Sequence, residues 1–233
     1  MNVCVIPARG GSKRIPRKNI KEFNGMPVIA YSIKAALKSK CFSQVIISTD
    51  DDEIAEVARK YGAQVPFIRP SELSSDFTGT FPVIKHAIEW LESKNNSIEN
   101  VCCLYATAPF IQSNIISEAY QKLLNSKSDY CFSVTSFPFP IQRSIRITEN
   151  DKVDMFYPEN FFARSQDLEE AYHDAGQFYW GRAEAFKNEL PIFSELSTPF
   201  VRPRYLVQDI DTAEDWTRAE VMYKVLQKTK VLS

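Results

Sequence analysis

Short apolar runs recur along the chain, and each is followed by a stretch in which apolar residues are spaced as on a helix. Four runs are of this kind: Val3–Pro7, Val45–Thr49, Val101–Tyr105 and Tyr130–Val134. Continuous apolar runs of this length are typical of strands that are buried on both faces. Because such strands alternate with helices, the pattern predicts an α/β protein with a parallel sheet covered by helices.

Five helices are predicted by apolar residues that recur three and four positions apart. The apolar stripes run over Ile29–Leu37, Ile54–Tyr61, Val83–Leu91, Ile115–Leu124 and Trp216–Leu226. Asp51 is placed to begin the second helix and Gly62 to end it. Thr212 opens the last helix with Asp215 three residues later, which is the spacing of a capping box.

One segment departs from this pattern. Residues 144–157 alternate polar and apolar side chains around Glu149-Asn150-Asp151, which predicts a β-hairpin inserted into the α/β pattern. Its apolar and aromatic residues are many for a hairpin in water: Ile145, Ile147, Val153, Met155, Phe156, Tyr157, Phe161 and Phe162. Either a partner subunit covers them or they fold back on the core of the same chain, and the first explanation is preferred.

Composition narrows the function classes. The 233 residues are 44% hydrophobic, enough for one sizeable core, and no linker divides the chain. A formal net charge of -1 argues against an extended nucleic-acid surface, so any anion site must be local.

The cysteines and the first residues bear on the compartment. Five cysteines without Cys-x-x-Cys spacing, mostly inside apolar runs, favour buried free thiols over disulfides. The first apolar run meets Arg9 too early for a secretory signal or a membrane span, so a cytoplasmic protein is expected.

The strongest local signal is the loop from Pro7 to Lys21, directly after the first predicted strand. It carries six basic residues and no acid: Arg9, Lys13, Arg14, Arg17, Lys18 and Lys21. Gly10-Gly11 would let backbone N–H groups approach an anion closely, although neither a Walker A nor a dinucleotide-binding motif is present. An ordinary solvated basic loop is the alternative. A loop at the carboxyl end of a parallel strand is where ligands bind in such sheets, which favours a phosphate site.

The second signal is Asp209-Ile210-Asp211, which follows the apolar run Tyr205-Leu206-Val207. If the strand continues, both carboxylates share one face and Ile210 points into the core. Two such oxygen donors suit Mg²⁺ held by substrate phosphates. Alternatively, one aspartate caps the following helix. Because a phosphate loop is also present in the chain, the metal interpretation is the better one.

Other polar residues are less specific. Asp50-Asp51-Asp52 precedes a helical stripe, where capping is the simpler role, and His86 lies on such a stripe as a packed or surface histidine. His173 stands beside Asp174 and Gln177 in what we expect to be a loop. It either contacts a substrate or structures that loop.

Several motifs together resemble the CMP-sialic acid synthetase family. They span the chain in that family's order: Ala8-Arg9-x-x-Ser12-Lys13-x-x-Pro16-x-Lys18-Asn19, Ser48-Thr49-Asp50, Arg69-Pro70-Ser71-Glu72-Leu73, Ser75-Asp76-x-x-x-Thr80, Leu104-x-x-Thr107-x-Pro109 and Asp209-Ile210-Asp211. The resemblance implies a Rossmann-like three-layer nucleotidyltransferase sheet in one cytidylyltransferase domain, residues 1–233. It also implies a homodimer built through an inserted hairpin subdomain, residues 138–170, and CTP-dependent activation of a 2-keto sugar acid.

The resemblance also implies roles for particular residues. The loop residues Gly10, Gly11 and Ser12 and five further residues would hold the cytidine and its phosphates, namely Arg9, Lys13, Asn19, Arg69 and Thr80. Lys18 would face the α-phosphate under attack, and Asp209 and Asp211 would carry Mg²⁺.

The chain departs from the sialic acid enzymes where they meet their sugar. Tyr105 to Ile111 replaces Gln-Pro-Thr-Ser-Pro-Leu-Arg, and His173 to Gly176 replaces Arg-Pro-Asn-Gly. The expected sugar contacts are Tyr105, Thr107, Ile111, His173, Asp174 and Gln177. Together with the phosphate loop, this stretch resembles the branch of the family that uses pseudaminic acid. A sialic, legionaminic or keto-deoxyoctulosonic acid, or a non-catalytic nucleotide-binding relative, is the alternative.

Overall fold

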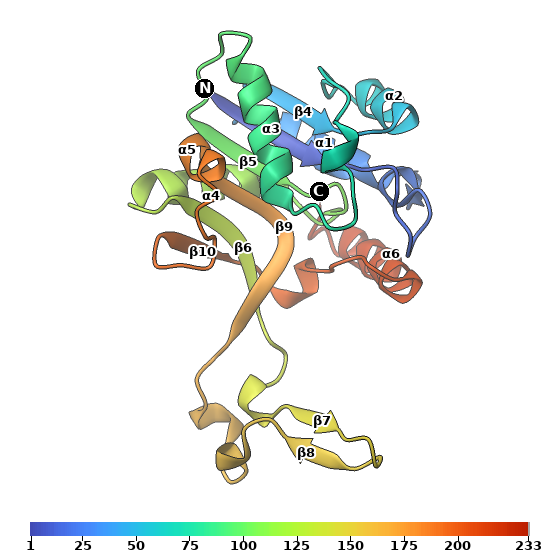
Figure 1. Cartoon of the computed structure of the whole chain (residues 1–233). Helices are drawn as coiled ribbons and strands as arrows, with labels where there is room; N and C mark the ends of the chain where they lie inside the picture. Colours follow the sequence, from blue (N-terminus) through green and yellow to red (C-terminus); the bar gives the residue numbers. More distant parts are fainter. Residues whose placement is uncertain (233) are drawn as a thin grey trace.

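A six-stranded sheet forms the centre of the structure, a computed structural model that describes residues 1–232 (Figure 1). The strand order is β10-β6-β9-β5-β1-β4. In chain order these strands are β1 (Asn2–Pro7), β4 (Gln44–Ser48), β5 (Asn100–Leu104), β6 (Tyr130–Ser136), β9 (Tyr172–Arg182) and β10 (Ser197–Val201). All neighbours pair in parallel except β9, which is antiparallel to both β5 and β6. The predicted α/β class with a mainly parallel sheet is therefore confirmed.

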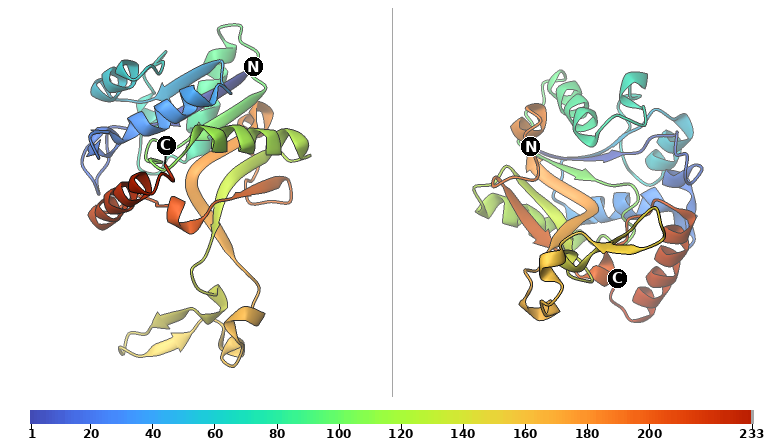
Figure 2. Two further views of the ribbon diagram at one scale, coloured as in Figure 1. Left: turned by 180° about the vertical axis from the view of Figure 1, so that it is seen from behind. Right: turned by 60° about the horizontal axis from the view of Figure 1, so that its bottom comes forward.

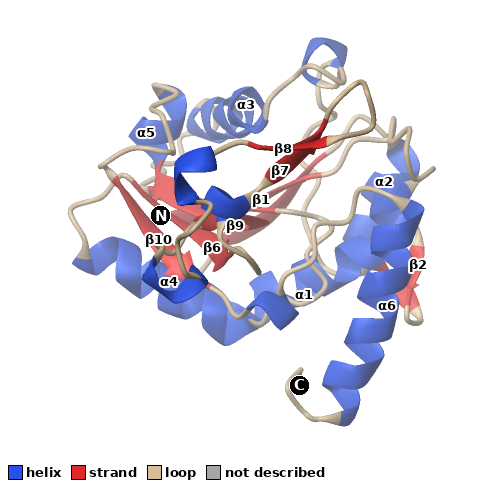
Figure 3. Ribbon diagram, turned by 90° about the horizontal axis from the view of Figure 1, so that it is seen from below, coloured by secondary structure: helices blue, strands red, loops and turns tan. Residues whose placement is uncertain are grey.

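Helices cover both faces of this sheet (Figure 3). The α-helices of the described residues are α1 (Val28–Ser39), α2 (Asp52–Lys60), α3 (Thr80–Glu92), α4 (Ser113–Asn125), α5 (Ala183–Lys187) and α6 (Ala213–Lys228). Helices α1, α2 and α4 pack on one face, and α3 and α5 pack on the other. Because successive strand residues point to opposite faces, Cys102 lies in one core and Cys103 in the other. No helix within the described part of the chain is long and apolar enough to cross a membrane.

The four predicted strands and five predicted helices all form, but the expected loop around His173 is the first half of strand β9. Its first half is polar, and Gly176 has a φ of 59°, which only glycine adopts at little cost. The pairing with β6 shifts there, between Phe132 and Val134. A bulge of this kind interrupts the regular alternation that identifies a strand in sequence, and it turns His173 and Asp174 toward the candidate site.

Helix α6 closes the carboxyl end of the sheet next to the predicted aspartate pair. Thr212 and Asp215 form the predicted capping box, with Asp215 N donating to Thr212 Oγ1 over 3.2 Å. Trp216 and Tyr223 pack with Phe23 from the loop that follows β1, which includes the short pair β2 (Glu22–Phe23) and β3 (Met26–Pro27). The two ends of the chain are thus joined at one side of the sheet.

The predicted hairpin also forms, as β7 (Ile145–Ile147) and β8 (Val153–Met155). It stands away from the body on a stalk formed by β6 and β9 (Figures 1 and 2). Its apolar side chains are exposed, Phe162 by 92% and Ile147 by 75%. These side chains therefore do not fold back on the core of the same chain.

Candidate active site

A pocket of about 610 Å³ lies at the carboxyl ends of β1 and β5, where the phosphate loop, Arg69 and the start of α3 meet. Most of the expected nucleotide contacts line it, namely Arg9, Ser12, Lys13, Asn19, Arg69 and Thr80, together with Lys18, Tyr105 and Thr107. Gly10 and Gly11 do not line it. The structure thus brings together residues that are up to about a hundred positions apart in the sequence.

Arg69 is the most deeply buried cation of this pocket. The residue is 5% exposed, and its Nε and Nη2 atoms have no hydrogen-bond partner among the described residues. Its nearest carboxylate oxygen belongs to Asp50 at 3.9 Å, and burial lowers the pKa of the guanidinium. A buried, unpartnered guanidinium is costly unless a ligand satisfies it, so Arg69 is suited to bind an acceptor group of the nucleotide.

The phosphate loop is braced by the acidic start of α2. Gly10 N donates to Asp50 Oδ1 over 2.9 Å, so this N–H is not free for an anion as the sequence had suggested. A Cβ atom at Gly10 would lie 2.6 Å from Asp51 Oδ2, so a larger residue at this position would collide with Asp51. Asp51 caps α2 through Ile54 N, as predicted, and also pairs with Arg17, which holds the pKa of its carboxyl at about 2.

Lys18 joins the two ends of the chain. Its Nζ atom donates to the carbonyl oxygen of Ile210 over 2.7 Å and lies 3.3 Å from Asp211 Oδ1. Arg14 also reaches Asp211, over 2.8 Å. These contacts hold the aspartate pair at the edge of the nucleotide pocket, although Lys18 and Asp211 are 193 positions apart in sequence.

The segment that carries the aspartates is not a strand, which corrects the prediction. Pro203 is followed by a 3₁₀ turn, Arg204–Leu206, and residues 207–211 form no helix or strand, although the backbone of Val207 is extended. Ile210 is fully buried, as predicted. The apolar run resembles a strand because it contains a buried residue, Leu206. Leu206, however, packs under helix α6 and not in the sheet.

Neither aspartate caps the following helix, because Thr212 and Asp215 fill that role. Asp209 is exposed to solvent, although the groups packed around its carboxylate partly desolvate it. This desolvation, and then the nearby Asp211 carboxylate, raise the pKa of Asp209. Within the described residues, no cluster of three or more potential ligands forms a metal site. Two neighbouring carboxylates, one of them open to solvent, fit a divalent cation that takes its remaining ligands from a substrate.

Two of the expected sugar contacts lie in a second pocket, which Asp209 also lines. His173, Asp174 and Asp209 line a pocket of about 720 Å³ at the base of the stalk. His173 Nδ1 lies 2.8 Å from its neighbour's carbonyl oxygen, and its ring packs on Phe137. Asp174 accepts hydrogen bonds from Gly176 N and from the hydroxyl of Tyr179.

Tyr105 separates this region from the nucleotide pocket. Its hydroxyl lies 3.2 Å from Thr80 Oγ1, and it lines a further, apolar pocket of about 260 Å³ together with Asp174, Tyr179 and Phe193. Tyr179 and Phe193 could not be predicted as site residues, since both occur in ordinary apolar runs. Only the pairing of β9 beside β5 could have drawn attention to Tyr179.

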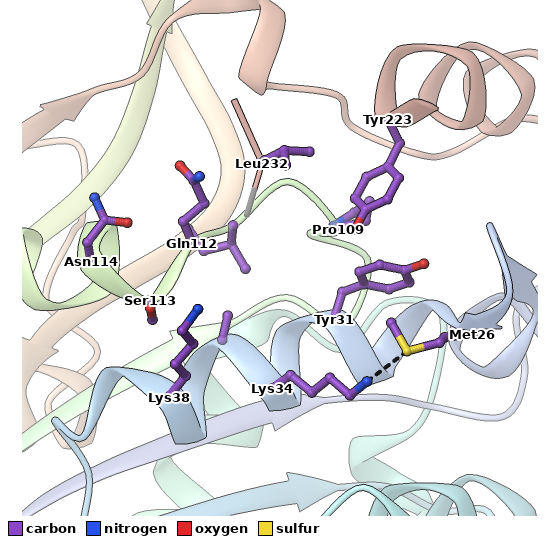
Figure 4. Close-up of a pocket in the computed structure, with 12 residues that line it drawn as sticks. Met26, Tyr31, Lys34, Lys38, Pro109, Gln112, Ser113, Asn114, Tyr223 and Leu232 are labelled. Carbon is purple, nitrogen blue, oxygen red and sulfur yellow. Dashed lines mark hydrogen bonds between the residues drawn. The ribbon is translucent and has the colours of Figure 1, made fainter. Parts of the chain in front are cut away.

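Three expected sugar contacts are placed elsewhere. Thr107 lines the nucleotide pocket. Gln177 is 2% exposed and donates to the carbonyl oxygen of Leu206 over 2.6 Å, so it fixes the segment that leads to the aspartates. Ile111 is buried and lines a separate pocket between α1, the start of α4 and α6 (Figure 4). In that pocket Lys34 points toward Met26, and neither Lys18 nor Asp209 lines it. Ile111 therefore does not face the candidate sugar site.

Comparisons with known proteins agree with this geometry. A family model described as cytidylyltransferase matches residues 3–227. The chain is 51% identical to a pseudaminic acid cytidylyltransferase of Campylobacter jejuni, over 96% of this chain and 97% of that protein. It is 31% identical to a CMP-N,N'-diacetyllegionaminic acid synthase of Legionella pneumophila, over 98% and 99% of the two chains.

Solved structures resemble the fold. A CMP:2-keto-3-deoxy-manno-octonic acid synthetase complexed with CTP superimposes with a TM-score of 0.69, at 16% identity, over 96% of this chain and 98% of that one. A 4-diphosphocytidyl-2C-methyl-D-erythritol synthase of Anaerococcus prevotii superimposes with a TM-score of 0.63, also at 16% identity, over the same shares of the chains.

Proposed function

The chain belongs to the cytidylyltransferase family, and from that premise we propose that it transfers CMP from CTP to the anomeric hydroxyl of pseudaminic acid and releases pyrophosphate. The choice of sugar rests on the 51% identity to a pseudaminic acid cytidylyltransferase along almost the whole chain. The legionaminic acid relative is only 31% identical.

The reaction is a displacement at the α-phosphorus. The anomeric oxygen of the sugar forms a bond to this phosphorus, the bond to the β-phosphate oxygen breaks, and the hydroxyl proton is lost. Positioning and charge neutralisation supply most of the rate enhancement in such transfers. We assign Arg9, Lys13 and Arg69 to the nucleotide, and Lys18 to the α-phosphate, because all four line one pocket.

Asp209 and Asp211 would hold Mg²⁺ in the complex. Their position supports this assignment, because Asp209 lines the sugar pocket and Asp211 contacts Lys18 of the nucleotide pocket. When bound there, Mg²⁺ supplies positive charge to the phosphates and lowers the pKa of a coordinated hydroxyl. Lys18 keeps Asp211 in place beside the pocket edge.

The sugar lies beyond Tyr105 in this proposal. Tyr105 and Asp174 each border the apolar pocket that contains Tyr179 and Phe193. An apolar recess with a few polar groups is suited to the deoxy end and the acylamino methyl groups of such a sugar. His173 lies at the neighbouring stalk pocket, where it can meet the sugar's polar groups.

Assembly and compartment complete the proposal. We expect residues 138–170 to form a homodimer interface, because their aromatic side chains are exposed on a protruding arm. We place the enzyme in the cytoplasm, since all five cysteines are free thiols, which suits a reducing compartment.

Pyrophosphate release tests the function directly. Protein, CTP, Mg²⁺ and pseudaminic acid should release pyrophosphate and form a CMP-sugar of the corresponding mass. Release with legionaminic, sialic or keto-deoxyoctulosonic acid in place of pseudaminic acid would change the sugar and keep the reaction. No release with any of these sugars would contradict the enzymatic proposal.

A further inference from the structure

The loop between the 3₁₀ turn Ser71–Leu73 and helix α3 lies at the rim of the nucleotide pocket. Asp76 and Thr78 of this loop line the pocket, while Phe77 at its tip is 98% exposed. The role of this loop is not explained by the catalytic proposal above, and it brings an acid into a pocket whose other charged groups are cations.

Asp76 alone ties the loop to a distant part of the protein. Its Oδ1 atom accepts a hydrogen bond from Arg9 Nη1 over 2.6 Å, and its Oδ2 atom pairs with Lys13 Nζ. Every other polar contact of loop residues 74–79 within the described chain reaches at most six positions along the sequence, such as Thr78 Oγ1 to the carbonyl oxygen of Glu72. Without the Asp76 contacts, no polar contact would hold the loop against the pocket.

The two cations bound by Asp76 are those assigned to the phosphates of the nucleotide. Lys13 and Arg9 lower the pKa of the Asp76 carboxyl, so the group is ionised at neutral pH. The same Arg9 Nη1 and Lys13 Nζ atoms cannot donate fully to Asp76 and to a phosphate at once. A triphosphate carries more charge and more acceptor oxygens than one carboxylate, so it can displace Asp76.

We propose that Asp76 is an intramolecular competitor for the phosphates: its carboxylate occupies Arg9 and Lys13 in the free protein, CTP displaces it, and its return assists the release of pyrophosphate. Asp76 thereby sets the affinity for ligands that carry phosphates and leaves that for unphosphorylated ligands unchanged. This inference rests on the proposed function for its ligand, CTP.

The size of the effect follows from the exposure of the ion pairs. The side chains of Arg9 and Asp76 are about one third exposed, and that of Lys13 is 80% exposed. Ion pairs of this kind contribute modestly, so removing the carboxylate should tighten phosphate binding by about three- to tenfold. Salt should reduce the difference, because both pairs are open to solvent.

Isothermal titration of the full chain tests the competition. For D76N, the Kd of CTP and the Kd of inorganic pyrophosphate should both fall by about three- to tenfold relative to the unaltered protein. Cytidine, which carries no phosphate, should bind both proteins equally. E72Q is the matched control: it removes an exposed acid four residues away that makes no ion pair with Arg9 or Lys13, and it should leave all three affinities unchanged.

Several outcomes would overturn the inference. Weaker or equal binding of CTP and pyrophosphate by D76N would mean that Asp76 supports the ligand or positions Arg9. Equal tightening by E72Q would mean that overall charge, not displacement, causes the effect. If neither protein bound CTP but D76N bound pyrophosphate more tightly, the proposed function would fail and the competition would stand.

Movement of the loop gives an independent measurement. Phe77→Trp places a fluorophore at the exposed tip, and CTP should shift its emission as Asp76 leaves the cations. In the Phe77→Trp protein that also carries D76N, the loop is already released, so the shift should be much smaller. Equal shifts in the two proteins would contradict displacement of Asp76.

Discussion

Asp209 and Asp211 lie two residues apart, but their carboxylates have different surroundings. Asp211 is paired with Lys18 and Arg14, whereas Asp209 is exposed at the stalk pocket, and partial desolvation and the Asp211 carboxylate raise its pKa. A bound cation would relieve the repulsion between the two carboxylates. Asp211 is held in place before any ligand binds.

Substitution of each aspartate should separate these roles. Asp211→Asn should keep the fold and lower turnover by about a hundredfold or more at limiting Mg²⁺. Asp209→Asn should lower turnover similarly, but the ligand-free protein should unfold at an equal or higher temperature, because the repulsion from the Asp211 carboxylate is gone. Steady-state kinetics and thermal unfolding measure the two effects.

Glu214→Gln is the control, since it removes an exposed acid from the first turn of α6. It should change neither turnover nor unfolding temperature beyond the error of measurement. Near-normal turnover of Asp211→Asn at limiting Mg²⁺ would exclude the aspartate pair from the mechanism.

At the scale of single residues, the sequence shows which side chains are charged but not which other side chains they contact. Lys18, Arg9 and the aspartates could be predicted because their types and spacing suit phosphate and metal chemistry. Asp76 and Tyr179 could not, because their chemistry depends on partners far away in sequence. Ile111 was misplaced because burial in a core and exposure in an apolar pocket select the same residue type.

At the scale of elements, the phosphate loop depends on helix α2. Asp51 caps this helix and also pairs with Arg17, which has a φ of 54°, an unfavourable value for arginine. The ion pair therefore holds the loop in a conformation that its own backbone disfavours. The capping role was predicted, but the contact with the loop could not be, since 34 positions separate the two residues.

Asp51→Asn tests this contact, because asparagine still caps a helix but carries no charge. The pKa of Asp51 in the folded protein, about 2, lies below its ordinary value of 3.8, so the pair stabilises the fold above that value and loses its effect as the pH falls toward 2. Denaturant unfolding should show a loss of about 1–2 kcal/mol at pH 7 that disappears near pH 2.

Asp52→Asn is the matched control on the same helix turn, where no ion pair with the loop is formed among the described residues. It should cost only a few tenths of a kcal/mol, roughly the helix-dipole contribution. An equal, pH-independent loss for both variants would show that the Arg17 pair does not stabilise the loop.

Strands that are buried on both faces could be predicted from their apolar runs, whereas β9 and the segment before the aspartates could not. In β9 the bulge at Gly176 and the polar residues of the site replace the regular pattern. At 205–207 the chain forms a 3₁₀ turn after Pro203, and only Leu206 is buried, under helix α6 instead of in the sheet. Both errors occur next to the candidate site, where ligand contacts override regular structure.

At the scale of the whole molecule, the exposed hairpin predicts a dimer. Light scattering at micromolar concentration should give about twice the chain mass of 26.7 kDa. The double substitution Ile147→Asp and Phe162→Asp places charges among the most exposed apolar side chains of the arm, so it should give monomers that remain folded. If light scattering gave the mass of one chain for the unaltered protein, the proposed interface would be contradicted.

The choice of sugar is the central claim, and it depends on the residues around Tyr105 and Asp174 rather than on the nucleotide pocket. A site built for one epimer leaves polar groups unpaired with another, at about 1–3 kcal/mol each. The most direct measurement is kcat/KM for pyrophosphate release with pseudaminic acid and with N-acetylneuraminic acid, under the same CTP and Mg²⁺. Two or three mismatches predict a preference for pseudaminic acid of about a thousandfold. Comparable values, or a preference for N-acetylneuraminic acid, would contradict the assignment.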